Sequence, residues 1–368
     1  MKIVELGKFY PPHYGGIETL LRSWCEGFVA SGAEVDCVVA HDHAQTVHEQ
    51  IGGVRVHRFA SFGTLLSTSI CPGYLRALGR YPADLWHSHF PNPLADVAVL
   101  TSSRRTPLVI SYHSDIVRQA GLMRLYGGVV RRLLDRAARI IVATPRHFEF
   151  SPWLQPFAAK TEVIPFGINL DRLSAVDPAH VAEFRARAKE HPILLTIGRL
   201  VGYKGHRYLL EAARELDALV WIVGNGPLET ELRRLTREWQ LEDRVRFWGS
   251  VSDADLPAML HACDVFVLPS ITPNEAFGLV QVEAMACGKP VVSCDLRSGV
   301  PFVNQHGVTG LVVPPANSSA LAEALKRLLG DEELRQQMGR AGRDRAHKEF
   351  AEKVMIERYW ACFERLTA

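Results

Sequence analysis

The sequence PSITPNEAFGLVQVEAMACG occupies residues 269–288 and decides how the C-terminal half of the chain is built. The apolar run DVFVL, residues 264–268, precedes it, and KPVVS, residues 289–293, follows it. Both runs are short and contain valine pairs, so they are predicted to form buried strands. Between them we expect a loop and then a helix from about Phe277 to Ala286 that ends at a glycine.

Two glutamates of this stretch are predicted to border one small volume. Glu275 lies on the loop just ahead of the predicted helix, and Glu283 lies within its first two turns. Helical side chains lean toward the N-terminus, so both carboxylates can reach the helix start, where free N–H groups favour a phosphate. These N–H groups belong to Phe277, Gly278, Leu279 and Val280. The arrangement suits a phosphorylated sugar, but spacing alone also allows a loop carboxylate and a solvated helix residue.

Length and composition narrow the class of protein. A chain of 368 residues suits two domains, and 47% hydrophobic with 22% charged residues is typical of a globular protein with sizeable cores. The net charge of +2 gives no reason to expect nucleic acid as a partner. Seven cysteines without a Cys-x-x-Cys pair favour reduced thiols in a cytosolic protein, and no leader or membrane-spanning run is expected.

The residues from Glu275 to Glu283, EAFGLVQVE, are followed by AMACGKPVV. This sequence resembles the Glu-x7-Glu signature of retaining glycosyltransferases of the GT-B architecture, and most closely that of family 4. The resemblance implies an α/β protein with two Rossmann-like domains that face each other across a cleft. We expect an acceptor-side domain at 1–172, a nucleotide-sugar-binding domain at 178–345, and a C-terminal helix at about 350–368 that crosses back to the first domain.

The N-terminal end of the chain reads as a strand, a glycine-containing loop and a helix. Residues 2–6 form the strand, and residues 19–31 show helical periodicity. Such a unit lets backbone approach a phosphate, although the Gly-x-Gly-x-x-Gly dinucleotide fingerprint is absent. The family resemblance implies that Gly15 and Gly16 face the donor diphosphate. A tight turn into a helix is the alternative.

Two histidines follow predicted strands of a mainly parallel sheet, where ligands gather at the carboxyl ends. His113 comes after the strand at 107–112, and the resemblance implies a place near the donor sugar. A lone histidine after a strand is otherwise more often structural. His89 occupies a similar position at the end of another strand.

Residues 117–141 form a basic helical region in which arginines alternate with apolar residues. One interpretation is a patch that rests on an anionic membrane surface, where lipid-linked acceptors occur. The other is a domain helix with one buried and one solvated face, since a docked helix needs the same apolar positions.

Cations follow the first strand of the second half. The strand at 192–199 ends in Arg199, and Lys204 follows before a helix; both match the family's Gly-Arg-Leu and Lys-Gly elements. They would neutralise the charge that grows on a departing nucleoside diphosphate, so no metal or other cofactor is expected. The resemblance further places Gly224 and Val251 beside the base.

The sequence departs from the family pattern in two places. Phe166 stands where the family usually has asparagine. In the segment 294–302, Ser298 and Phe302 replace the first glycine and the glutamate of the usual Gly-Gly-x-x-Glu element. The roles of the replaced residues are therefore not carried over. At the C-terminus, helices are predicted at 320–329, 331–338 and from about 345 to 367.

The resemblance implies a retaining hexosyltransferase that uses a nucleotide-diphospho-sugar. Glu275 would contact the hexose, Glu283 the ribose, and His113 the sugar site. We favour GDP-mannose as donor and a glycan or lipid-linked acceptor of a cell-surface polysaccharide, with a UDP-hexose as the alternative. The protein would be cytoplasmic, and the inner face of the cell membrane is the alternative location. A sugar-nucleotide epimerase, a phosphorylase and a non-catalytic subunit of a glycan-assembly complex are the rival functions.

Overall fold

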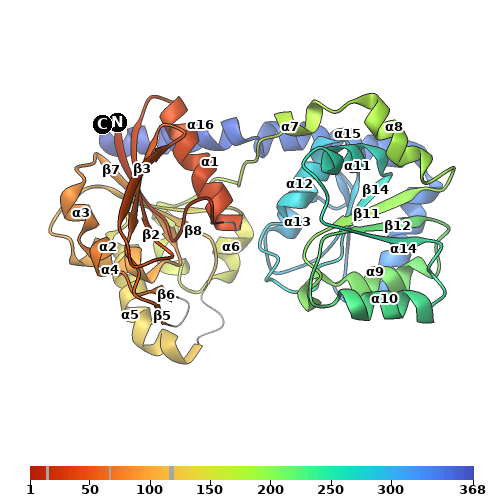
Figure 1. Ribbon diagram of the computed structural model, residues 1–368, viewed down its shortest axis with the longest axis horizontal. Coiled ribbons are helices and arrows are strands. Elements are labelled where there is room, and N and C mark those ends of the chain that lie inside the picture. The colour runs from red at the N-terminus through yellow and green to blue at the C-terminus, as the bar shows by residue number, and fades with distance from the viewer. Residues whose placement is uncertain (14–15, 66–67, 116–119) are drawn as a thin grey trace. The chain divides into compact units, whose positions relative to one another are not determined.

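The computed structural model describes residues 1–13, 16–65, 68–115 and 120–368, and it divides into two compact units (Figure 1). Unit 1 comprises Met1–Ile168 and Glu352–Ala368, and unit 2 comprises Asn169–Ala351. Each unit is an α/β domain around a mainly parallel sheet, so the predicted fold class is confirmed. The division falls before Asn169, close to the predicted end of the first domain at residue 172.

The sheet of unit 1 has the strand order β10-β9-β8-β7-β1-β2-β4-β3, and only the pairing of β3 with β4 is antiparallel. The chain adds strands outward from β1 on one side and from β7 on the other, so the order reverses between these two neighbours. Ligands of such sheets bind at this reversal. The strands are β1 (Lys2–Leu6), β2 (Glu34–Ala40), β3 (Val47–Ile51), β4 (Val54–Phe59), β7 (Leu85–Phe90), β8 (Leu108–Tyr112), β9 (Arg139–Val142) and β10 (Thr161–Val163), with a separate hairpin of β5 (Thr64–Leu65) and β6 (Thr68–Ser69).

Helices cover both faces of this sheet (Figure 1). On one face α1 packs against α16, and they approach so closely that a Cβ on Gly27 would lie 2.6 Å from Ile356. On the other face α4 packs against α2 and α5. The helices of unit 1 are α1 (Gly16–Ala30), α2 (Pro72–Leu75), α3 (Ala77–Arg80), α4 (Pro93–Thr101), α5 (Ala120–Arg136), α6 (Pro145–Phe150), a 3₁₀ turn at Gln155–Lys160, and α16 (Glu352–Thr367).

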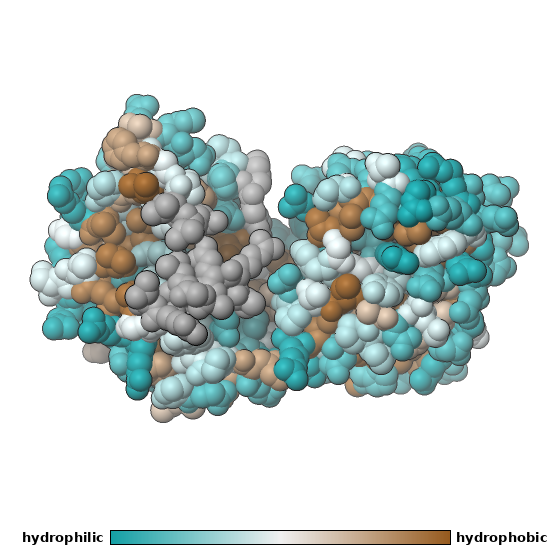
Figure 2. Space-filling view, turned by 90° about the horizontal axis from the view of Figure 1, so that it is seen from below, coloured by the Kyte–Doolittle hydropathy of each residue, from teal (hydrophilic) through white to brown (hydrophobic). Residues whose placement is uncertain are grey.

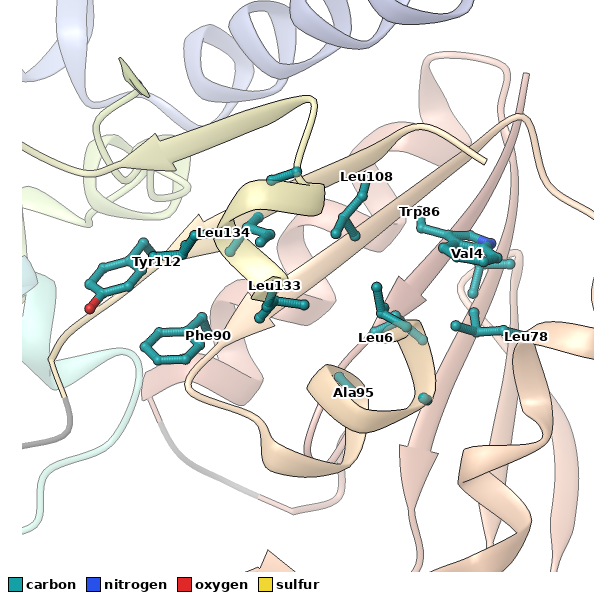
Figure 3. Close-up of a cluster of buried hydrophobic side chains, with 14 of the residues drawn as sticks. Val4, Leu6, Leu78, Trp86, Phe90, Ala95, Leu108, Tyr112, Leu133 and Leu134 are labelled. Carbon is teal, nitrogen blue, oxygen red and sulfur yellow. The ribbon is translucent and has the colours of Figure 1, made fainter. Parts of the chain in front are cut away.

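The core beneath α4 and α5 joins side chains of the strands to those of the helices (Figure 3). Trp86 and Leu108 from neighbouring strands contribute to it, together with Leu133 and Leu134 from α5. These side chains are fully buried. At about 25 cal/mol per Å² of apolar surface, such burial is the dominant favourable contribution to folding of the unit.

The structure places α5 as a helix with one packed and one solvated face. Val130 and Leu133 are buried, whereas Arg131 and Arg132 are exposed. The first residues of the basic region and the side chains of 120–125 lie outside what the structure describes. The domain-helix interpretation accounts for the described part of α5, and contact with a membrane stays a prediction.

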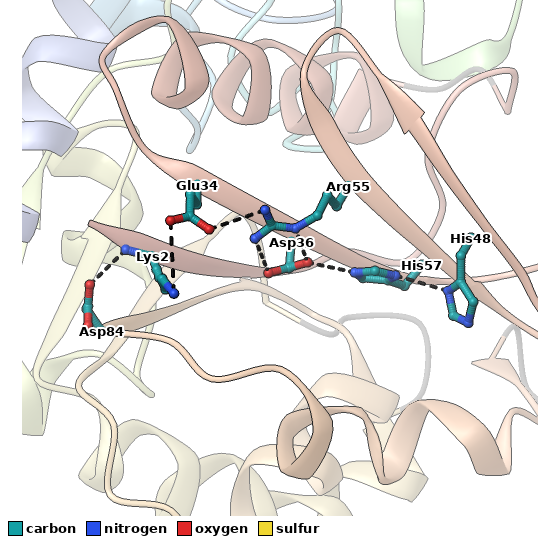
Figure 4. Close-up of polar contacts among 7 residues, drawn as sticks. All are labelled: Lys2, Glu34, Asp36, His48, Arg55, His57 and Asp84. Atoms are coloured by element: carbon teal, nitrogen blue, oxygen red, sulfur yellow. Dashed lines mark hydrogen bonds and ion pairs between the residues drawn. The ribbon is translucent and has the colours of Figure 1, made fainter.

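A polar network ties β2 to β4 at one side of unit 1 (Figure 4). Arg55 donates two hydrogen bonds of 2.8 Å to the Asp36 carboxylate, and His57 Nε2 lies 2.7 Å from the same group. His57 also stacks on Tyr81. Burial alone would raise the pKa of Asp36, but the bonds from Arg55 and His57 outweigh it and lower the pKa to about 2.

Asp36→Asn is expected to destabilise unit 1 by about 2 kcal/mol at pH 7. A lowered folded-state pKa stabilises the fold above the unfolded value near 4, so the difference from wild type should shrink as pH falls from about 4 toward 2. Hydrogen exchange of β2 and β4 amides at pH 7 and at pH 3, inside that window, measures it. Glu34→Gln is the matched control, because Glu34 contacts Arg55 from a 55% exposed side chain and should contribute little. Equal effects of the two variants would contradict the prediction.

The sheet of unit 2 is fully parallel, in the order β13-β12-β11-β14-β15-β16. Its order reverses between β11 and β14, which are hydrogen-bonded neighbours. The loops that follow these two strands therefore leave the same edge of the sheet side by side. The strands are β11 (Ile193–Ile197), β12 (Leu219–Val223), β13 (Val245–Gly249), β14 (Val265–Leu268), β15 (Val291–Cys294) and β16 (Gly310–Val313).

The helices of unit 2 form two groups (Figure 1). In the first group, α9 packs against α10 and against α14. In the second group, α8 packs against α11, and α12 packs against α15. Their bounds are α7 (Asp171–Ser174), α8 (Pro178–Ala186), α9 (His206–Ala213), α10 (Glu229–Glu238), α11 (Asp255–Ala262), α12 (Leu279–Ala286), α13 (Val300–Val303), α14 (Ser318–Gly330) and α15 (Glu332–Glu349), with a 3₁₀ turn at Gly202–Lys204.

The C-terminal helices differ from the prediction. One helix, α15, extends from Glu332 to Glu349 and belongs to unit 2, and a second, α16, begins at Glu352 in unit 1. The predicted end of one helix at 338 and the predicted start of the next at about 345 were therefore wrong. Phe350 has non-helical dihedral angles and is fully buried against Phe277 and Phe302, so packing sets the break.

Hydrophilic residues predominate on the face shown in Figure 2, with smaller apolar areas between them. The large apolar side chains with the greatest exposure include Phe62, Val308 and Ile70. Among the described residues no helix combines the length and hydropathy needed to span a bilayer.

Candidate active site

The closest contact among the predicted site residues joins Lys204 to Glu275. Lys204 Nζ lies 2.6 Å from Glu275 Oε2, although the two residues are far apart in the sequence. Lys204 follows β11 and Glu275 follows β14, so the reversal of strand order brings their loops together. Both side chains are only about one-tenth exposed, which strengthens the ion pair relative to a surface pair.

A serine not predicted from the sequence completes this contact. Ser270 Oγ is fully buried and donates a 2.9 Å hydrogen bond to the same oxygen, Glu275 Oε2. Within the described residues no group donates to the other oxygen, Oε1. One carboxylate oxygen thus fixes the position of Glu275, and the second keeps its lone pairs for a ligand.

Glycines let the neighbouring backbones approach closely. A Cβ on Gly205 would lie 2.0 Å from the carbonyl oxygen of Pro269, and Gly205 has a positive φ of 69°. Similarly, a Cβ on Gly224 would lie 2.1 Å from the carbonyl oxygen of Gly198. The glycine of the Lys-Gly element is therefore required by the packing of one loop on the other. Val251, predicted beside the base, follows β13 and is half-buried.

The start of α12 differs from the prediction. The helix begins at Leu279 because Gly278 adopts a left-handed conformation with φ 72° and ψ 60°. Phe277 and Gly278 therefore precede the helix, and their assignment to its first turn was wrong. Leu279 and Val280 remain its first two residues, whose N–H groups have no carbonyl partner within a helix.

Arg199 differs from Lys204 in its surroundings. It lies two residues beyond the end of β11, and its side chain is exposed. No ion pair or hydrogen bond engages its guanidinium in the described part of the chain. The charge of Lys204 is balanced by Glu275, so Arg199 is the predicted site cation whose charge stays available to an anion.

Glu283 lies in the second turn of α12 with its side chain 11% exposed, and it forms an ion pair with Arg172 of α7. Burial raises the pKa of Glu283, although the Arg172 guanidinium opposes the shift. Its partner, Arg172, is the residue at which the first domain was predicted to end. The interpretation as a solvated helix residue does not fit this burial.

His113, the predicted site residue of unit 1, belongs to a buried hydrogen-bonded network. Its Nε2 lies 3.2 Å from His89 Nδ1, and His89 Nε2 lies 3.0 Å from Glu5 Oε2. The other oxygen of Glu5 lies 2.9 Å from His87 Nδ1. His87 Nε2 continues to Ser111, whose hydroxyl bonds to the Tyr359 hydroxyl on α16. We call this set of residues the Glu5 network.

Within the Glu5 network, Glu5 is ionised, whereas His89 and His113 are neutral. Burial opposes ionisation of Glu5, but His87 and His89 outweigh it and lower the pKa to about 2. Burial, with His87 nearby, lowers the pKa of His89 to about 4 despite Glu5. Burial and the neighbouring imidazoles also lower the pKa of His113 well below its usual range.

Potential metal-ligand atoms of Glu5, His87 and His89 lie within 4.8 Å of one another. Each of these atoms already takes part in a hydrogen bond with a second member of the group. The contacts are thus satisfied without an ion, and we assign no metal to them.

Gly15 lies outside the described residues. Gly16 is the first residue of α1. The predicted diphosphate contact of these two glycines therefore stays a prediction.

Two family models match the chain. One, described as glycosyl transferases group 1, matches residues 181–345, and the other, described as a glycosyl transferase 4-like domain, matches residues 15–167. In addition, O-antigen chain mannosyltransferase C of Escherichia coli is 33% identical over 367 residues, which cover 98% of this chain and 97% of that protein. The chain belongs to glycosyltransferase family 4. It is a glycosyltransferase, as the resemblance implied.

Other relatives of this glycosyltransferase are named as a rhamnosyltransferase and as a mannosyltransferase that acts on a phosphatidylinositol mannoside. D-rhamnosyltransferase WbpZ of Pseudomonas aeruginosa is 32% identical, covering 92% of this chain and 90% of the relative. GDP-mannose-dependent alpha-(1-6)-phosphatidylinositol monomannoside mannosyltransferase of Mycobacterium tuberculosis is 31% identical, covering 91% of each. The glycosyltransferase thus functions in polysaccharide or glycolipid biosynthesis.

Solved structures agree with the GT-B fold. Sucrose-phosphate synthase from Thermosynechococcus elongatus superimposes with a TM-score of 0.78 at 26% identity, covering 99% of this glycosyltransferase and 98% of that chain. HepE of Anabaena in complex with UDP has a TM-score of 0.81 at 22% identity, covering 99% and 100%. The second likeness concerns the fold alone.

Several residues of these sites were not predicted from the sequence, among them Ser270, Glu5 and Arg172. Ser270 lies two residues beyond the end of β14, so a polar residue just after a strand was the available signal. Glu5 interrupts an apolar strand, where a carboxylate needs a buried partner. Arg172 carried no local signal, because only the fold brings α7 to α12.

Proposed function

We propose that this glycosyltransferase moves a hexose, with retention at the anomeric carbon, from a nucleotide-diphospho-sugar to a glycan or lipid-linked acceptor. The observation that carries the proposal is the pairing of Lys204 and Ser270 with one oxygen of Glu275. It leaves Glu275 Oε1 as a fixed hydrogen-bond acceptor suited to sugar hydroxyls. A charged carboxylate there also stabilises positive charge that develops on the sugar.

The diphosphate is assigned to cationic and backbone groups of unit 2. The exposed guanidinium of Arg199 suits two phosphate oxygens at once. The N–H groups of Leu279 and Val280 at the start of α12 favour an anion. We assign Glu283 to the ribose, with Arg172 orienting its carboxylate, and Gly224 and Val251 to the base. His113 of unit 1 is assigned a sugar hydroxyl.

The favoured donor is GDP-mannose. The names of the relatives from Escherichia coli and Mycobacterium tuberculosis support it, since one is a mannosyltransferase and the other GDP-mannose-dependent. The rhamnosyltransferase relative supports a second possibility for the transferred sugar, a 6-deoxyhexose in place of mannose. A UDP-hexose is the alternative, because HepE binds UDP on a similar fold.

We further propose that the acceptor is lipid-linked and that the protein meets it at the inner face of the cell membrane. The exposed Arg131 and Arg132 on α5 support this, because cationic side chains are attracted to anionic lipid headgroups.

A calorimetric titration with GDP, UDP and ADP in EDTA tests the donor. We expect GDP to bind at least tenfold more tightly than the others, a difference of about 1.4 kcal/mol. Binding should not need a divalent cation, because the proposed diphosphate ligands are protein groups. Preference for UDP would replace GDP-mannose by a UDP-hexose, and absence of binding by any nucleotide would contradict the proposal.

A further inference from the structure

The Glu5 network joins three neighbouring strands to α16 and ends at His113. Its members come from β1, β7 and β8, on both sides of the reversal in strand order. The assigned functions use only His113. The remaining members are buried in the core, where polar groups are retained only with a complete set of partners.

The direction of the first hydrogen bonds is set by Glu5. An ionised carboxylate accepts hydrogen bonds and donates none. Both of its oxygens face a ring nitrogen, so His87 donates from Nδ1 and His89 donates from Nε2. The lowered pKa of Glu5 agrees with the ionised form.

The direction of the next bond follows from the neutral state of His89. A neutral imidazole carries one N–H, and in His89 it is at Nε2, so Nδ1 is an acceptor. The partner at 3.2 Å, His113 Nε2, must then be the donor. His113 is neutral as well, which leaves its Nδ1 without a proton. No group of the described residues hydrogen-bonds this Nδ1.

Aromatic rings hold the two imidazoles in place. His89 and His113 lie nearly parallel, with 5.4 Å between their centroids and an interplanar angle of 7°. The ring centroid of Trp24 lies 4.8 Å from that of His89 and 5.8 Å from that of His113. The ring centroid of Phe166 lies 5.6 Å from that of His113. Phe166 supplies an apolar wall at the position where the family usually has asparagine.

We propose that Glu5, acting through His89, is a positioning residue that fixes His113 as the Nε2–H tautomer with a hydrogen-bond acceptor at Nδ1. Such an acceptor matches a hydroxyl of a sugar substrate and rejects a phosphate oxygen, which has no proton to donate. This substrate assignment rests on the proposed function. The tautomer itself rests only on the Glu5 network.

Histidine ¹⁵N spectra of the full chain test the tautomer without any substrate. With His113→Gln to assign the signals, we expect His113 in the wild type to carry its proton on Nε2 at pH 7. A proton on His113 Nδ1, or a charged His113, would overturn the proposal. So would a stoichiometric zinc ion in the purified protein, because zinc would replace the proton on His89 Nε2.

Two leucine variants distinguish a positioning role from a packing role: His89 lies between Glu5 and His113, whereas His87 does not. In His89→Leu, His113 should populate both tautomers, whereas His87→Leu, which removes the other partner of Glu5, should leave the wild-type form. If both leucine variants lost the Nε2–H tautomer of His113 to the same extent, the network would have a structural role only. His89→Gln keeps one donor and one acceptor and should restore the Nε2–H form, which guards against a misfolded leucine variant.

Release of nucleoside diphosphate from the donor tests the link to substrate. We expect kcat to fall about tenfold in His89→Leu, the effect of one misdirected hydrogen bond, with unchanged nucleotide affinity and with recovery in His89→Gln. Unchanged kcat together with mixed tautomers would overturn the substrate contact. An inactive wild type with the Nε2–H tautomer would instead count against the proposed function and leave the tautomer in place.

Discussion

Replacing Glu275 by glutamine is expected to lower kcat about 100- to 1000-fold, which corresponds to roughly 2.7–4 kcal/mol of transition-state stabilisation. The amide keeps the size of the side chain and can still accept the bond from Ser270. It loses the negative charge that is proposed to stabilise the developing sugar cation, and it leaves Lys204 without its counter-charge. Donor affinity should change much less, because other groups are assigned to the nucleotide.

Glu283→Gln is the matched control for this experiment. Both glutamates belong to the same signature and are similarly buried, but Glu283 pairs with Arg172 and is assigned to the ribose. The control should therefore raise KM for the donor more than it lowers kcat. Release of nucleoside diphosphate measures both variants. If Glu275→Gln turned over like the wild type, Glu275 would have no part in the chemistry.

Arg199→Ala is expected to remove about 2–4 kcal/mol of transition-state stabilisation, visible as loss of kcat as well as of donor affinity. Its guanidinium is exposed and not balanced by a carboxylate among the described residues, so its full charge can meet the departing diphosphate. Removal of this exposed side chain should leave stability nearly unchanged. Lys204→Ala would be harder to interpret, because it leaves Glu275 buried and unpaired.

Two controls sharpen the Arg199 experiment. Arg199→Lys keeps the charge but loses the two-pronged geometry, so its activity should fall between the wild type and Arg199→Ala. Arg234→Ala removes another exposed arginine of unit 2, one that pairs with Glu238 on α10, and should leave activity unchanged. A loss confined to substrate affinity in Arg199→Ala would argue against stabilisation of the transition state.

Local sequence features predicted the elements but not all of their ends. Short apolar runs such as 264–268 became strands, because β-branched residues suit a buried parallel sheet. The start of α12 was placed too early, since nothing in the sequence required Gly278 to adopt positive φ. The break between α15 and α16 was missed because buried Phe350 fixes it through distant aromatic partners.

The candidate site shows the same division. The resemblance around residues 198–205 and 275–283 predicted which cations and carboxylates line the site, but it could not say how they pair. Lys204 was predicted to meet a diphosphate, and in the structure its nearest partner is Glu275. Glu283 was predicted to border the same volume as Glu275, and its ion pair is with Arg172.

The sequence by itself determined the α/β class and the family, because strand and helix periodicity and the signature motif are local properties of the chain. Only the tertiary structure decided which distant side chains meet. The reversal of strand order between β11 and β14 joins Lys204 to Glu275, and adjacent strands of unit 1 join Glu5 to the histidines that lead to His113. Sheet order depends on how whole elements pack together, so no local pattern encodes these contacts.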